Sequence, residues 1–149
     1  MQAIKEKLLG FRTKRASNPV PRKTLNYQDA KRIGVLFKVS DEDKHDDINR
    51  FIHALEKDGK KIEALTFFNR DHDNPYDFKY DFFTEKDISV LGDIKSGSVK
   101  RFMEQNFDYL FCISREPIQA FNFIMAKSSA RCRVGRYTEG NEALYELMI

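Results

Sequence analysis

Residues 107–137, FDYLFCISREPIQAFNFIMAKSSARCRVGRY, decide the fold of this chain. The first seven are apolar on both faces and rich in aromatic side chains, which is typical of a buried strand in a parallel sheet. Apolar residues then recur at helical spacing between Ile118 and Met125, and the last seven residues alternate again. We expect Ser114 to cap this helix and Pro117 to lie at or near its first turn. Because a strand–helix–strand unit of this length makes a right-handed parallel crossover, the stretch predicts an α/β fold.

The rest of the chain predicts further elements of the same kind. Apolar runs at residues 32–39 and 62–68 predict two more parallel strands, joined by a helix that Gly59 closes. The other expected elements are a short strand at 78–84, a helix from Ser96 or Ser98, and a helix or edge strand at 142–149. Together they predict a single three-layer Rossmann-like domain with a mainly parallel sheet of about five strands. We assign residues 1–31 to a basic N-terminal arm with a short amphipathic helix, and residues 32–149 to the α/β domain.

Composition limits the class of protein. With 149 residues, 41% of them hydrophobic, the chain can bury one core and is expected to form one domain. No apolar run approaches the roughly 20 residues that span a bilayer, and the N-terminus lacks the apolar segment of a secretory signal. Cys112 and Cys132 lie inside predicted strands and suit small core residues better than a disulfide or a nucleophile. We therefore expect a cytoplasmic protein.

Charge is unevenly distributed along the chain. Residues 1–38 carry ten Lys and Arg against two Asp and Glu, whereas the remaining residues carry sixteen against twenty-one. A basic arm therefore precedes a mildly acidic domain. Within the arm, Ile4, Leu8 and Phe11 fall on one face of an expected helix, which the prolines of the NPVP sequence at residues 18–21 terminate.

Three interpretations of the arm stay open. It can pack its apolar face on the domain and leave its charges in water. It can contact RNA phosphates, since such contacts need only clustered cations. It can lie on an anionic membrane surface through Ile4, Leu8 and Phe11. The residues that would contact phosphate are Arg12, Lys14, Arg15, Arg22 and Lys23.

The carboxyl ends of the strands are the second place to look for a site. Ligands of open α/β sheets bind beyond these ends, and a dinucleotide-binding fold carries its glycine-rich loop after the first strand. Here that position reads SDEDK at residues 40–44, and its carboxylates would repel a pyrophosphate. Neither this glycine pattern nor a P-loop occurs elsewhere, so we expect no nucleotide cofactor. The sheet-end candidates are Ser40, Asp41, Ser114, Arg115 and Glu116.

One loop offers metal-ligand chemistry without a metal-binding pattern. Residues 70–73 read RDHD, and Asp41, Asp43 and His45 would follow a neighbouring strand. Hard divalent cations prefer such oxygen ligands, and a histidine can join them. The spacing matches no known metal loop, so we favour a solvated loop and expect no metal site.

Two resemblances accompany these patterns. The strand–helix–strand segment at residues 107–137 resembles the corresponding stretch of heptosyltransferase-type glycosyltransferases, and covers 31 residues. From residue 32 onward the chain is similar to an uncharacterised bacterial family, a domain of unknown function. The residues that carry this second resemblance are Ile33–Phe37, Phe83–Gly92, Phe107–Asp108 and Arg133–Gly135. It implies the α/β fold and no catalytic residue.

These patterns favour a non-catalytic binding or interaction module that docks on RNA or a ribonucleoprotein through its basic arm. One alternative is a reduced glycosyltransferase-like or nucleotide-binding enzyme using the residues at 114–116. Such transferases hold their donor with a second domain, for which this chain is too short. The other alternative is a peripheral membrane-associated protein.

Overall fold

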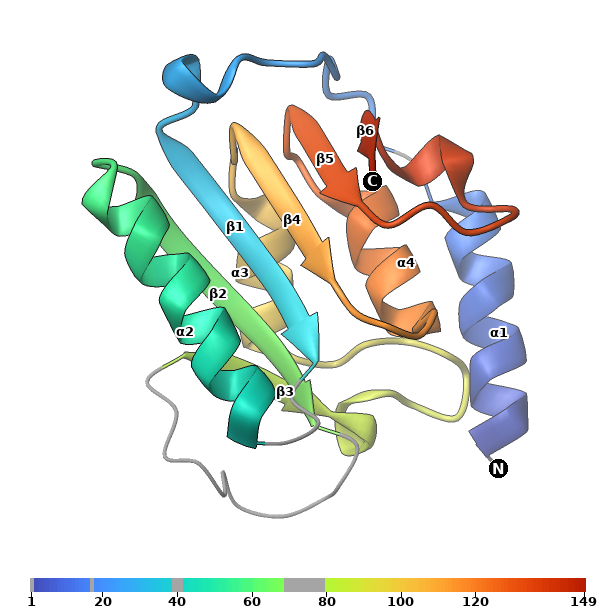
Figure 1. The fold of residues 1–149 in the computed structure, drawn as a ribbon. Coiled ribbons are helices and arrows are strands. Elements are labelled where there is room, and N and C mark those ends of the chain that lie inside the picture. The colour runs from blue at the N-terminus through green and yellow to red at the C-terminus, as the bar shows by residue number, and fades with distance from the viewer. Residues whose placement is uncertain (1, 17, 39–41, 69–79) are drawn as a thin grey trace.

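One sheet of six parallel strands organises the molecule (Figure 1). The computed structural model describes residues 2–16, 18–38, 42–68 and 80–149. The strands stand in the order β3-β2-β1-β4-β5-β6. Their bounds are β1 Arg32–Lys38, β2 Lys61–Phe68, β3 Asp81–Thr84, β4 Tyr109–Ile113, β5 Cys132–Gly135 and β6 Leu147–Met148. The helices are α1 Gln2–Arg15, α2 Glu42–Lys57, α3 Gly97–Glu104 and α4 Gln119–Lys127. The expected Rossmann-like α/β fold is therefore confirmed.

Several expected boundaries agree with the structure and one does not. Ser96 caps α3 by accepting a hydrogen bond from the backbone N–H of Val99 at 3.3 Å. The C-terminus, left open between helix and strand, forms a short 3-10 helix, η3 (Glu142–Leu144), and then β6. The expectation that Ser114 caps the next helix is wrong, because α4 starts later, after Ile118. Pro117 lies ahead of the helix, and the Ser114 hydroxyl bonds instead to the backbone of Glu116.

Two apolar layers flank the sheet, and we call its two sides the closed face and the open face. On the closed face, α3 and α4 pack over residues such as Leu36, Leu65 and Leu110. On the open face, α2 packs over Val35 and Phe37. Residues of the two faces alternate along each strand, as the pleat of a sheet requires.

The direction of the crossovers explains why the open face is only half covered. Because β–α–β crossovers are right-handed, those leading toward β3 and those leading toward β6 lie on opposite faces. The helix α2 joins β1 to β2 and belongs to the first kind, whereas α3 and α4 lead to β4 and β5 and belong to the second. In the described part of the chain, no helix therefore lies over β4, β5 and β6 on the open face (Figure 1).

The N-terminal helix packs on the domain with a different side from the one expected. Leu9 is buried, with 2% of its surface exposed, and joins the core where α1 lies along α4. Ile4 and Phe11 are exposed, so one of the three interpretations of the arm, in which the face of Ile4, Leu8 and Phe11 packs on the domain, is wrong. Successive helical residues are about 100° apart, which places Ile4 and Phe11 roughly 150° from Leu9 around the helix. The helix thus carries apolar residues on two opposite sides.

Candidate functional site

A groove of about 660 Å³ lies on the open face at the carboxyl ends of β4 and β5. Phe111, Ile113 and Val134 form its apolar floor, and Phe111 pairs in register with Val134. Ile48 of α2 lines one part of the groove and Ile149, beyond β6, lines another. The strand order reverses between β1 and β4, and open α/β sheets bind ligands beyond the strand ends at such a point. The groove therefore lies where this class of fold places its ligands.

Polar side chains gather at the strand ends of the groove. Ser114 folds the loop after β4, since its hydroxyl donates to the carbonyl of Glu116 at 2.7 Å. The ammonium of Lys38, the last residue of β1, lies 3.8 Å from a carboxylate oxygen of Glu116. Arg136 follows β5, and its guanidinium donates to the carbonyl of Arg115 at 3.4 Å. One end of an otherwise apolar groove is therefore strongly polar.

The charges at this end do not all have partners. Glu116 faces Lys38, and Asp47 on the wall of the groove pairs with Arg50 at 2.9 Å. Arg115 and Arg136 are both exposed, and neither is paired with a carboxylate among the described residues. These two guanidiniums are the side chains available to an anionic group in the groove.

The structure brings together three of the five predicted sheet-end residues. Ser114, Arg115 and Glu116 all line the groove, whereas Ser40 and Asp41 lie outside the described residues. Lys38 and Arg136 were not anticipated. Each stands at the end of a parallel strand, which is the signal that could have identified them.

Two of the five cations predicted to contact phosphate are engaged within the protein. Arg12 donates to the carbonyl of Leu91 at 3.1 Å and pairs with Asp93 at 2.7 Å. Arg22 donates to the carbonyl of Ala130 at 2.5 Å. Burial, together with the neighbouring charge of Arg133, lowers the pKa of the Arg22 guanidinium, although Glu146 acts in the opposite direction. The three other predicted cations, Lys14, Arg15 and Lys23, have exposed side chains.

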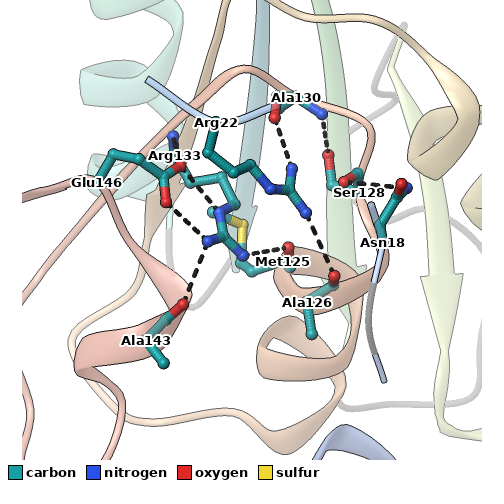
Figure 2. A network of polar contacts seen from close by, with 9 residues as sticks. All are labelled: Asn18, Arg22, Met125, Ala126, Ser128, Ala130, Arg133, Ala143 and Glu146. Atoms are coloured by element: carbon teal, nitrogen blue, oxygen red, sulfur yellow. Dashed lines mark hydrogen bonds and ion pairs between the residues drawn. The ribbon is translucent and has the colours of Figure 1, made fainter. Parts of the chain in front are cut away.

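Arg22 belongs to a polar network at the C-terminal end of α4, which Figure 2 shows. Arg133 of β5 forms two contacts with the Glu146 carboxylate, at 3.0 and 2.7 Å, and its Nη1 donates to the carbonyl of Met125 at 3.1 Å. Asn18 donates to the carbonyl of Lys127 at 2.9 Å. The last carbonyls of a helix have no partner within it, so these side chains complete α4. The network is structural, and it ties the arm to the domain.

The outward side of α1 and the turn beside it carry apolar residues that we call together the α1 stripe. Its residues are Ile4, Leu8, Phe11, Val90 and Leu91. The exposed fractions of Ile4, Phe11, Val90 and Leu91 are 53%, 54%, 47% and 68%. Gly92, with a φ of 82°, brings the turn against α1, since a Cβ there would lie 2.9 Å from the backbone nitrogen of Leu9. The turn therefore places Leu91 beside the helix, where its carbonyl accepts a hydrogen bond from Arg12.

The two cysteines have thiols whose pKa values are raised. Cys112 and Cys132 are free. Burial raises the pKa of the Cys112 thiol to about 11, although a hydrogen bond with Tyr145 acts in the other direction. Burial is also the largest cause that raises the pKa of Cys132. No group of three or more metal-ligating side chains occurs among the described residues. The loop at 70–73 lies outside the described residues.

A doubly wound α/β domain with a groove at its strand ends is the class of protein that the fold and this site define. A family model described as "Family of unknown function (DUF6913)" matches residues 4–149. The chain belongs to this family, which confirms the resemblance to a domain of unknown function. No curated protein and no solved structure matches the chain, and the comparisons give no support for a glycosyltransferase.

Proposed function

We propose that this protein is a binding module that docks on an anionic membrane surface through the α1 stripe. The observation that supports the proposal is the group of four exposed apolar side chains on the outward side of α1 and the adjoining turn. Single exposed apolar residues are ordinary on protein surfaces, whereas a contiguous group of them marks an interaction site.

Cations stand on both sides of the stripe. Counting about 100° per residue, Lys7 and Lys14 fall on one side of Ile4 and Phe11, and Arg15 falls on the other. The guanidinium of Arg15 lies 4.4 Å from the centre of the Phe11 ring. A helix that lies in a membrane interface has this arrangement, because its apolar residues enter the bilayer while flanking Lys and Arg reach the anionic headgroups.

The same facts weaken docking on RNA, which the charge of the arm alone favours. Arg12 and Arg22 are occupied by contacts within the protein, so three predicted phosphate contacts are left. Contacts to phosphate also give no role to the apolar side chains of the α1 stripe. RNA binding is therefore the competing outcome of the test. Attachment would be peripheral, since no helix of the described residues has the length and apolar character of a membrane span.

The test is co-sedimentation of the intact chain with phosphatidylglycerol-containing vesicles and with vesicles of phosphatidylcholine alone. We expect binding to the first only, weakening as salt screens the cations. Replacing Phe11 and Leu91 together by Ser should abolish it. Phe82→Ser is the matched control, because Phe82 is also exposed but lies on β3 at the edge of the sheet.

A second set of substitutions compares the cations beside the α1 stripe with cations on α3. The triple substitution Lys7→Gln, Lys14→Gln and Arg15→Gln should reduce vesicle binding at least tenfold, whereas Lys100→Gln with Arg101→Gln on α3 should not. A protein that ignores anionic vesicles but binds total RNA in a salt-dependent manner would replace this proposal with RNA docking. Unchanged vesicle binding after Phe11→Ser with Leu91→Ser would also overturn it.

A further inference from the structure

The groove on the open face is independent of the α1 stripe and has a chemistry of its own. Its floor is made by apolar residues of β4 and β5, and its polar residues lie at the strand ends, apart from Asp47 on α2. A volume of about 660 Å³ falls within the range of small-molecule sites, which is roughly 300 to 1,000 Å³. A ligand that fits must therefore be apolar along most of its length and polar at one end.

The topology explains why this part of the sheet is left for a ligand. Parallel strands are normally buried on both faces, and their residues are apolar on both sides accordingly. Here the open face of β4 carries Phe111 and Ile113, both only partly buried. The Phe51 ring of α2 reaches Phe111, with ring centres 5.3 Å apart, but no helix of the described residues crosses over β4. The linker after α1 crosses the amino ends of these strands. There the Leu25 carbonyl accepts a hydrogen bond from the Tyr109 hydroxyl, and the backbone N–H of Lys23 donates to the carbonyl of Arg131.

Two arginines make the charge at the polar end of the groove positive. Lys38 and Glu116 face each other across the ends of β1 and β4 and largely balance. Arg115 and Arg136 are left without a carboxylate partner among the described residues, and the contact between Arg136 and the Arg115 carbonyl keeps them at the same end. Guanidinium groups bind carboxylate and phosphate through charge-assisted hydrogen bonds.

We infer that the groove binds an amphipathic acid, with its chain over Phe111, Ile113 and Val134 and its acidic group on Arg115 and Arg136. The apolar floor supplies the area that such a chain buries, and the paired guanidiniums select an acid over an alcohol. The acid group can be a carboxylate or a phosphate monoester, since both match the guanidinium geometry.

The probe is octanoate, titrated calorimetrically into the full-length chain, with 1-octanol as the uncharged analogue of the same length and octyl phosphate as the second acid. We expect both acids to bind and octanol to bind at least tenfold more weakly. Arg115→Gln with Arg136→Gln should weaken octanoate about tenfold or more and leave octanol unchanged. Lys100→Gln with Arg101→Gln removes the same number of charges from α3 and should have no effect.

Backbone amide shifts locate the ligand independently of any substitution. Octanoate should shift the signals of Ile113, Val134 and Gly135, and leave those of the α1 stripe unmoved. The variant that carries both Phe11→Ser and Leu91→Ser should bind octanoate as the parent protein does. This variant therefore distinguishes a failure of membrane docking from a failure of octanoate binding.

Three outcomes would overturn the inference. The first is equal affinity for octanoate and octanol, and the second is a set of shifted signals outside the groove. The third is a dimer in analytical ultracentrifugation that Ile113→Asp converts to a folded monomer, because the open face would then be covered by a second copy of this chain.

Discussion

The two faces of the sheet differ in how completely the chain covers them. On the closed face, α3 and α4 bury the strands from β3 to β5, and the segment around η3 continues the cover toward β6. On the open face, α2 covers β1 and β2, whereas β4 and β5 form the floor of the groove. The sequence of both faces is apolar, so composition does not explain the difference.

The right-handedness of the β–α–β connections explains why the two faces are covered differently. Three successive connections lead toward β6 and fall on the closed face, and they crowd it with helices. Among the described residues, the open face receives one helix, α2. A face that is apolar without being covered is where a binding site costs the fold least, because no packing has to be given up to admit a ligand. Substitutions on the two faces should therefore have different consequences, and the following predictions measure that difference.

The largest effect is expected at Arg133, on the closed side of β5. Arg133→Met would take the guanidinium away from the Glu146 carboxylate, whose side chain is 15% exposed and which would keep the backbone N–H of residue 133. The carbonyls of Met125 and Ala143 would also lose a donor. Removing one member of a buried ion pair typically destabilises a protein by about 3–5 kcal/mol. Urea unfolding should report a loss of this size. Arg133→Met with Glu146→Met should recover part of it, and a double variant no more stable than the single would contradict this account.

Next in size is a comparison along a single strand, β4. Leu110 points into the closed face and is fully buried, so Leu110→Ala should cost about 3 kcal/mol through lost burial and the cavity left behind. Ile113 points into the groove and is only partly buried, so Ile113→Ala should cost about 1 kcal/mol. Chemical denaturation of both variants gives the two values. Equal losses would mean that the open face is packed as tightly as the closed one.

These contrasts also show which features of the structure could be predicted from the sequence. The unit from β4 to β5 was predictable, because its strand and helix periods are local and its connection has one allowed hand. Arg133 was visible only as part of a family resemblance. Its role depends on Met125, Ala143 and Glu146, which the fold brings together from different elements.

The arm shows where a local pattern misleads. Periodicity gives Ile4, Leu8 and Phe11 as the apolar side of α1, but Leu9 is an apolar residue on the opposite side of the helix. The side that packs is decided by contacts of Leu9 and by the approach of the turn at Gly92, both of which are tertiary. The groove was likewise beyond the sequence, because it follows from strand order, which no local pattern contains. Once that order is known, handedness predicts the open face.

A smaller effect is expected at the amino ends of the strands, where Asp108 joins β1 to β4. Its carboxylate accepts hydrogen bonds from the backbone N–H groups of Lys31 and Arg32 at 2.8 and 3.0 Å. Burial alone would raise the pKa of Asp108, but these bonds and the charges of Arg131 and Arg32 outweigh it and lower the pKa. The folded pKa is below the unfolded value, so the stabilisation is present above an unfolded pKa of about 3.9 and is lost as the pH falls through the folded pKa.

Asp108→Asn should therefore destabilise the protein by about 1 kcal/mol at neutral pH, in the range of a single hydrogen-bonding contribution. The loss should shrink as the pH falls below the unfolded pKa of about 3.9 toward the lower folded pKa, because the stabilisation by the carboxylate is lost over that range. Thermal unfolding at several pH values measures this. Asp81→Asn, an exposed acidic residue on β3, is the control and should change little at any pH. A loss for Asp108→Asn that does not vary with pH would assign its role to shape rather than charge.

The smallest effect on stability is expected at Phe11, and it is informative because it is small. A residue with 54% of its surface exposed adds little to folding, so Phe11→Ser should change the free energy of unfolding by less than about 0.5 kcal/mol. Leu9→Ser on the opposite side of the same helix buries a hydroxyl in the core and should cost several times more. If Phe11→Ser proved as costly as Leu9→Ser, the α1 stripe would be part of the core. A negligible change in the free energy of unfolding would mean that Phe11 is not needed for folding and is available to contact a partner. The vesicle experiment tests whether that partner is an anionic membrane.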